Sequence, residues 1–212
     1  ARAADAGRLY LSLEYLAQAE DLLGGARVMV DSAELAKAGP AEFESAWGAA
    51  SVRLAARDRE ARERKWVNVP VAVRALAEAA QGRSIPLLDG ARGFATAKGP
   101  AEGLFYMGQA EGEADFARFC ATLDLTSGKR AFPLRSFLPE LLALQARTNA
   151  AFQPPKSIDL HPGYIALNSA NKLGEELDST KFYAGALYQY LEAVRHFGML
   201  DQPPLDAAGQ LR

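Results

Sequence analysis

The chain has 212 residues, 49% of them apolar, and its 24 basic and 26 acidic residues give a net charge of −2. This length allows a sizeable core without disulfides or a structural metal, and the near-neutral charge excludes the strong field that draws proteins onto nucleic acid. One cysteine and two histidines exclude an intrachain disulfide and the usual Cys/His zinc site, so we expect no metal and no cofactor.

Apolar residues recur at helical spacing along almost the whole chain, and no long stretch alternates as a strand would. The predicted fold class is therefore all-α. A first helix is predicted over 5–23, ended by Gly24-Gly25, and a second over 26–38. Gly39-Pro40 then predicts a helix-to-helix corner, because Gly is favoured just past one helix and Pro just inside the next; a third helix follows over 41–65.

Further breaks of the same kinds divide the rest of the chain. Gly99-Pro100 repeats the corner, and Pro86 is tolerated because it lies in the first turn of a predicted helix. The clearest break is Gln-Pro-Pro-Lys-Ser over 153–157, so a single domain over 1–212 is predicted, with a candidate sub-boundary near 153–160. The remaining helices are predicted over 69–82, 84–98, 100–123, 136–152, 162–177 and 179–200.

Two segments of the chain resemble each other. Phe105-Tyr106-Met107-Gly108 aligns with Phe182-Tyr183-Ala184-Gly185, and the match continues without a gap to Arg118 over Arg195. A second similarity joins the two Gly-Pro corners, each of which continues as Ala-Glu. These matches predict one helical hairpin used three times, over 26–65, 84–123 and 162–200. Chance similarity between Ala-rich amphipathic helices is the alternative.

The order Phe-Tyr-x-Gly, an acidic residue, Arg, Leu-Asp and a later Pro resembles the second half of a tetratricopeptide-type (TPR-like) repeat. The chain departs from that family in the first half, where no Trp-x-x-Leu-Gly-x-x-Tyr pattern stands, and its hairpins exceed the usual ~34 residues. The resemblance covers about half of the chain, and it implies stacked antiparallel helical hairpins with a concave surface that binds a protein or peptide. An irregular helical bundle is the alternative architecture.

Candidate binding residues lie on the two matching helices, where aromatic and arginine side chains offer anchor-type contacts. Glycines four residues apart either admit a second helix at close range, the favoured interpretation, or leave a groove. Asp115 with Arg118 and Glu192 with Arg195 are also spaced as helical ion pairs. The candidates for partner or ligand binding are Tyr106, Gly108, Gly112, Arg118, Tyr183, Tyr188, Tyr190 and Arg195.

The predicted function is a non-catalytic interaction or scaffold module that binds a protein or peptide partner. A carrier of a small apolar or aromatic ligand in a pocket between hairpins is the alternative, with the two glycines and the tyrosines as its wall. An all-α enzyme is third, because the sequence carries no nucleophile elbow and no phosphate-cradling loop. Glu192 and His196 share a helix face, but a metal site would need distant ligands to converge on them, so no catalytic or metal-binding residue is predicted.

Other features bear on location and partners. No apolar run reaches the ~20 residues of a membrane-spanning helix, and the acids interleaved in the basic run 53–65 predict a solvated face with ion pairs and no nucleic-acid stripe. Ala-Arg-Ala-Ala at the start is of the small-residue type found at signal-peptidase sites, so a periplasmic protein and a cytoplasmic one trimmed at its start remain equal alternatives. Abundant Arg and Ala indicate a bacterial source.

Overall fold

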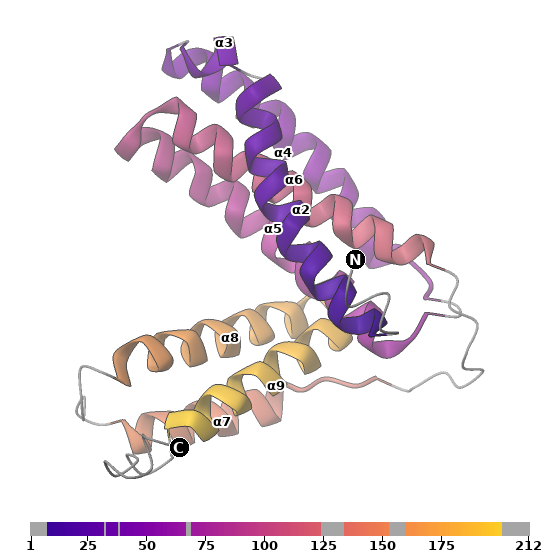
Figure 1. The fold of residues 1–212 in the computed structure, drawn as a ribbon. Helices are drawn as coiled ribbons and strands as arrows, with labels where there is room; N and C mark the ends of the chain where they lie inside the picture. The colour runs from indigo at the N-terminus through magenta and orange to yellow at the C-terminus, as the bar shows by residue number, and fades with distance from the viewer. Residues whose placement is uncertain are drawn as a thin grey trace.

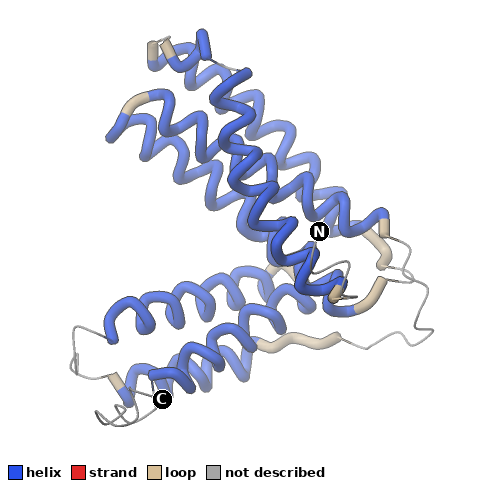
Figure 2. The backbone as a smooth tube through the Cα atoms, viewed as in Figure 1, coloured by secondary structure: helices blue, strands red, loops and turns tan. Residues whose placement is uncertain are grey.

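The computed structural model describes residues 8–31, 33–37, 39–66, 69–123, 134–152 and 160–200, and all regular structure within these ranges is helical (Figure 2). The all-α prediction is therefore confirmed for this part of the chain. The predicted connection over 124–135 and the candidate sub-boundary near 153–160 fall almost wholly outside the described residues. None of the described helices is long and apolar enough to cross a membrane.

The helices form two groups that meet at one end and diverge from there (Figure 1). The first, here called the N-terminal bundle, consists of α2 (Leu9–Asp31), the single-turn α3 (Ala33–Ala36), α4 (Pro40–Glu63), α5 (Val71–Lys98) and α6 (Pro100–Thr122). The second, the C-terminal bundle, consists of α7 (Leu138–Ala151), α8 (His161–Ser179) and α9 (Tyr183–Leu200).

Both predicted Gly-Pro corners are confirmed. Pro40 and Pro100 each open a helix in the first turn, where a missing N–H costs no helical hydrogen bond. Gly99 has a φ of 105°, a left-handed conformation that a side chain would strain, and its N–H donates to the Ala95 carbonyl at 3.0 Å. This residue alone separates α5 from α6, so the two helices form an antiparallel hairpin.

Two predicted helix ends are wrong. α2 runs through Gly24-Gly25, and α5 runs through Gly82, so Pro86 stands inside α5 instead of in a first turn. These glycines mark close contacts between helices: a Cβ at Gly24 would lie 2.5 Å from the carbonyl oxygen of Gly108, and a Cβ at Gly82 would collide with Leu177. Because residues 26–31 belong to α2, the predicted hairpin over 26–65 does not form as one unit.

The core of the N-terminal bundle lies around α6, which packs against α2, α4 and α5. Two apolar clusters fill it. The first lies between α4, α5 and α6 and includes Phe43, Leu54, Leu88, Leu104 and Met107. The second lies between α2, α5 and α6 and includes Leu13, Val73, Leu76, Phe116 and Cys120.

The two aromatic residues that define the predicted repeat have unlike surroundings. Phe105 lies inside α6, half-buried, with its ring against Gly25 of α2. Phe182 lies just before α9, is only 5% exposed and packs with Leu177 and Ala186. Helix–helix packing is compatible with a helical repeat, but the matched phenylalanines do not occupy equivalent positions.

The two bundles are joined where the start of α9 packs against the first half of α5, at Glu78 and Ala79. Glu78 of α5 is 2% exposed and accepts hydrogen bonds from the backbone N–H groups of Ala184 (2.8 Å) and Gly185 (3.0 Å). Its other oxygen pairs with Arg74 at 2.6 Å. A buried carboxylate thus satisfies N–H groups that the first turn of α9 leaves without helical partners.

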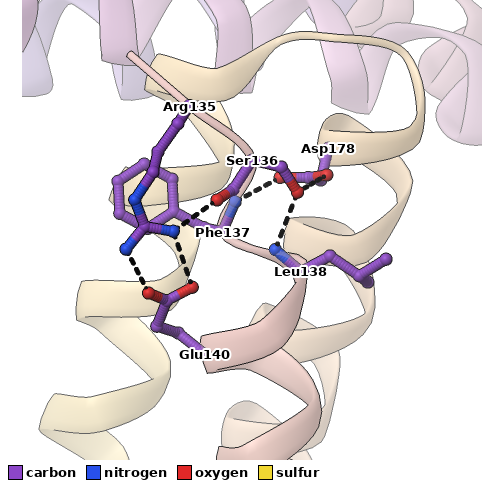
Figure 3. Close-up of polar contacts among 6 residues, drawn as sticks. All are labelled: Arg135, Ser136, Phe137, Leu138, Glu140 and Asp178. Carbon is purple, nitrogen blue, oxygen red and sulfur yellow. Dashed lines mark hydrogen bonds and ion pairs between the residues drawn. The ribbon is translucent and has the colours of Figure 1, made fainter. Parts of the chain in front are cut away.

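The C-terminal bundle is fixed at the start of α7 by Asp178 of α8 (Figure 3). The Asp178 carboxylate accepts hydrogen bonds from the Ser136 hydroxyl (2.7 Å) and from the Phe137 N–H (2.6 Å). The Ser136 hydroxyl oxygen in turn accepts the Leu138 N–H at 3.2 Å, and Arg135 pairs with Glu140. Ser136 therefore contacts the first N–H group of α7, but the N-cap position itself is Phe137, which makes no side-chain capping hydrogen bond.

Candidate functional site

An open cleft of about 930 Å³ lies between the two bundles. Its walls come from α2, α5 and α6 on one side and from α8 and α9 on the other. Apolar and charged side chains both contribute to the lining. A cleft of this size between separately packed helices is suited to bind a ligand or a short segment of another chain.

The deepest charged group on the cleft wall is the ion pair between Arg83 of α5 and Glu113 of α6. It is bidentate, with Nε to Oε1 at 2.7 Å and an Nη to Oε2 at 2.9 Å. The Glu113 side chain is only 6% exposed. Burial raises the pKa of Glu113, and the charge of Arg83 opposes this shift. The paired geometry holds both side chains in one orientation at the floor of the cleft.

Asp21 of α2 lies beside this pair. Gln109 donates a hydrogen bond to its Oδ2 at 3.1 Å, whereas its Oδ1 is buried and has no hydrogen-bond partner within the described chain. Burial raises the pKa of Asp21, and the charge of Arg83 and the hydrogen bond from Gln109 only partly offset it. Asp21 is thus a carboxylate held where its ionised form is unfavourable.

Tyr188 of α9 faces the N-terminal bundle across the cleft. Burial raises the pKa of its hydroxyl, and the nearby charges of Glu192 and Glu14 raise it further. The phenol therefore stays protonated at neutral pH. Protonated, it serves as a hydrogen-bond donor and as a flat apolar surface.

Five carboxylates and three cations line the cleft. Each cation pairs with one carboxylate: Arg83 with Glu113, Lys172 with Glu176 at 3.8 Å, and Arg195 with Glu192 at 2.6 Å. Glu14 and Asp21 have no ion pair with any described residue within 4.0 Å. The cleft consequently carries an excess of negative charge.

Two of the candidate binding residues predicted from the sequence, Tyr188 and Arg195, line this cleft. Gly108 and Gly112 do not, because α2 covers them; a Cβ at Gly112 would lie 2.5 Å from the Glu20 carbonyl oxygen. The favoured interpretation of these glycines, close helix packing, is confirmed.

The other candidates lie away from the cleft. Tyr106 stacks on Phe94 with ring centroids 3.9 Å apart, and Tyr190 packs near Phe137 in the C-terminal bundle. Arg118 forms the predicted pair with Asp115 at 3.9 Å on the surface of α6. Tyr183 opens α9.

Sequence reasoning missed Asp21, Arg83 and Glu113. They come from three different helices and are far apart in sequence, so no local motif contains them. One signal was present: Glu113 falls in a stripe of otherwise apolar or small residues on α6, and a charged residue in such a stripe needs a buried partner.

Within the described residues, no three His, Cys, Asp or Glu side chains come together as metal ligands would. His196 lies beside Arg195, with 3.3 Å between its Nε2 and an Arg195 nitrogen, so the ring faces a cation. Glu192, the other half of the site considered from the sequence, pairs with the same arginine. Glu192 and Arg195 both line the cleft.

The chain matches no known protein family, no curated protein and no solved structure. The fold and the site are therefore the basis for describing this protein. It is an all-helical protein of two bundles, with an acidic cleft between them.

Proposed function

We propose that this protein is a non-catalytic binding module, built on a helical-hairpin scaffold, whose cleft takes a basic segment of a protein or peptide partner. A lysine or arginine side chain of the partner enters between the bundles and pairs with Asp21. Tyr188 and Arg195 contact the rest of the segment at the side formed by α9. The packing of α5 with α6 and of α8 with α9 as antiparallel neighbours supports the hairpin scaffold.

The observation that carries this proposal is the uncompensated charge of Asp21. A buried carboxylate oxygen without a hydrogen bond is unfavourable, and an incoming ammonium or guanidinium group supplies both the charge and the donor that it lacks. Asp21 lines the cleft, so a cation that enters it approaches this carboxylate. Glu14, on the same face of α2 and also without an ion pair, adds to the attraction.

A random-peptide display library panned on the immobilised protein tests the proposal. We expect enrichment of sequences with Lys or Arg at a fixed position, and binding that weakens as salt is raised, because the attraction is electrostatic. Isothermal titration of one selected peptide then compares the wild type with Asp21→Asn. Loss of one charged contact weakens binding about tenfold.

Asp89→Asn is the matched control, since Asp89 is an exposed aspartate of α5 that does not line the cleft. It removes the same charge and leaves peptide affinity unchanged. Selected peptides without basic residues, or equal affinity for the wild type and Asp21→Asn, would overturn the proposal.

One observation favours a second candidate function, acid–base catalysis in the same cleft. Raised pKa values of neighbouring carboxylates in a cleft, here Asp21 and Glu113, are frequent in enzyme sites. A peptide selected on the cleft distinguishes the two: catalysis requires its covalent change on prolonged incubation, detected by mass spectrometry, whereas a binding module returns it intact. A small apolar ligand is less favoured, because the cleft is open and charged.

A further inference from the structure

A second, smaller cavity of about 280 Å³ lies beside the start of α5. It is enclosed by the end of α4, the first turns of α5 and the turn between α8 and α9. Four of its lining side chains are cationic, and two are aromatic. They are Arg62, Arg64, Arg74 and Lys181, with Trp66 and Phe182.

The three arginines keep donors free for a ligand. Each forms its ion pair through a single nitrogen: Arg62 through Nε to Asp58 at 2.6 Å, Arg64 through one Nη to Glu60 at 2.7 Å, and Arg74 through Nε to Glu78 at 2.6 Å. No other hydrogen bond of these guanidinium groups is found within the described chain. A guanidinium fork has five N–H donors, so each arginine can add an oxyanion to the bond that it already makes.

Among the described residues that line the cavity, Glu78 is the one carboxylate, and its charge is already compensated. One oxygen pairs with Arg74, and the other accepts the N–H groups of Ala184 and Gly185. The side chain is nearly inaccessible to solvent. The side chains that line the cavity are therefore mainly cationic, while Asp58 and Glu60, which pair with Arg62 and Arg64, lie outside the lining.

Lys181 adds a fourth cation, and the backbone turn that carries it is held by hydrogen bonds. It lies in a turn with a φ of 66°, held by hydrogen bonds from its own N–H to the Asp178 carbonyl and from the Phe182 N–H to the Leu177 carbonyl, each 2.9 Å long. No described carboxylate lies within 4.0 Å of its ammonium group. A non-glycine residue in this conformation is uncommon, so the turn directs a lysine here at some cost in backbone energy.

The aromatic side chains supply a flat apolar wall. The guanidinium carbons of Arg64 and Arg74 lie 5.8 and 5.9 Å from the Trp66 ring centroid, and that of Arg62 lies 5.7 Å from the Phe182 ring. Cations held over aromatic faces stay oriented, and the exposed part of a ring can stack on a planar ligand.

We propose that this cavity is a binding site for a small organic phosphate, a phosphate monoester that carries a planar group. The dianionic phosphate accepts N–H donors from the arginines and Lys181, and the planar group lies against Trp66. Several cations around one cavity favour a doubly charged phosphate over a monocarboxylate. The site is separate from the acidic cleft and does not depend on the function proposed for it.

Isothermal titration with phenyl phosphate tests the inference, with inorganic phosphate and phenol as partial ligands. We expect one saturable site for phenyl phosphate, weaker binding of inorganic phosphate and no measurable binding of phenol. Affinity should also fall as salt is raised, because the recognition is ionic. Absence of saturable binding of phenyl phosphate at millimolar concentration, or equal binding of phenol, would overturn it.

Two variants locate the binding. Arg64→Gln removes one guanidinium group. Lys181→Asn removes one ammonium group and places there a residue that tolerates the left-handed backbone conformation. Each substitution should weaken the binding of phenyl phosphate about tenfold. Arg92→Gln is the matched control: Arg92 also lies over a tryptophan, Trp47, at 4.3 Å, but does not line this cavity. Unchanged affinity in both test variants, or an equal loss in Arg92→Gln, would contradict the proposed site.

Discussion

At the scale of single residues, the ionised form of Asp21 lowers the stability of the fold and at the same time provides the charge that the proposed binding needs. Burial raises its pKa above the ordinary value of 3.8, so the native state binds a proton more tightly than the unfolded chain. The contribution of Asp21 to stability is then largest when it is protonated, and it declines as pH rises from the unfolded pKa to the folded one. A residue with this behaviour is expected where an external cation completes the site.

We predict that Asp21→Asn gains free energy of unfolding relative to the wild type as pH rises above 3.8, because only the wild type must ionise this buried carboxyl group. Urea unfolding at several pH values measures the difference. The shift of Glu78 cancels because Asp21 does not contribute to it, whereas loss of the Asp21 charge removes one cause of the raised pKa of Glu113 and so acts in the same direction. A difference independent of pH, or one of the same size in Asp89→Asn, would show that burial of Asp21 does not set its pKa.

Cys120 of α6 gives a second prediction at this scale. Its side chain is fully buried, and burial raises the pKa of the thiol to about 12, so the reactive thiolate is scarce. A disulfide reagent should label Cys120 at least ~100-fold more slowly in the native protein than in the unfolded chain. The absorbance of the released thiolate reports the rate. Rapid labelling under native conditions would contradict the packing of α6 against α2 and α5.

The sequence revealed the parts of the candidate site that have a local signature. Tyr188 and Arg195 were predicted as binding residues because an aromatic and an arginine on one helix are typical anchors, and both line the cleft. Asp21 and Arg83 were missed because each is an ordinary charged residue on its own helix. Their role follows only from the crossing of α2 and α5 with α6, which no short-range pattern specifies.

At the scale of secondary-structure elements, the contact between α2 and α6 depends on glycine. Gly24 and Gly108 face each other closely enough that a Cβ on either would meet the backbone of the other helix, and Gly112 lies against Glu20 in the same contact. The absence of side chains lets the two backbones approach. This contact places Asp21 and Gln109 within hydrogen-bond distance, and so it forms one wall of the cleft.

We predict that Gly24→Ala lowers the free energy of unfolding by about 1–3 kcal/mol, because the added methyl group forces the helices apart. Gly48→Ala is the control. Gly48 also lies inside a helix, but a Cβ there meets nothing within 4 Å, so the change should raise stability by about 0.5–1 kcal/mol through helix propensity. Urea unfolding measures both, and equal effects of the two substitutions would be incompatible with a close α2–α6 contact.

Glycines also show which parts of the fold could be predicted from the sequence and which could not. Gly39 and Gly99 were correctly assigned to corners, since each precedes a proline that opens the next helix. Gly24 and Gly82 were assigned wrongly to helix ends, because glycine serves equally as a terminator and as a point of close approach. The deciding partners, Gly108 and Leu177, lie far away in the sequence.

At the scale of the whole molecule, Glu78 holds the two bundles together. Its carboxylate joins Arg74 to the first turn of α9, where α5 and α9 pack against each other. We predict that Glu78→Ala lowers the free energy of unfolding by about 2–4 kcal/mol, since it leaves two N–H groups and one guanidinium without their partner.

Glu63→Ala is the control for this prediction, because Glu63 is an exposed acid at the end of α4. It should change stability by less than about 0.5 kcal/mol. Chemical unfolding followed by circular dichroism compares the two variants. A loss in Glu78→Ala no larger than that in Glu63→Ala would contradict the structural role of this carboxylate between the bundles.

Amide chemical-shift mapping with a selected lysine-containing peptide tests most directly whether the cleft between the bundles binds a basic segment through Asp21. We predict that the shifted amides lie on the cleft-lining faces of α2, α5, α8 and α9, and that the shifts are much reduced in Asp21→Asn and unchanged in Asp89→Asn. Shifts confined to the outer faces of α4 or α7, or identical in the wild type and Asp21→Asn, would contradict it.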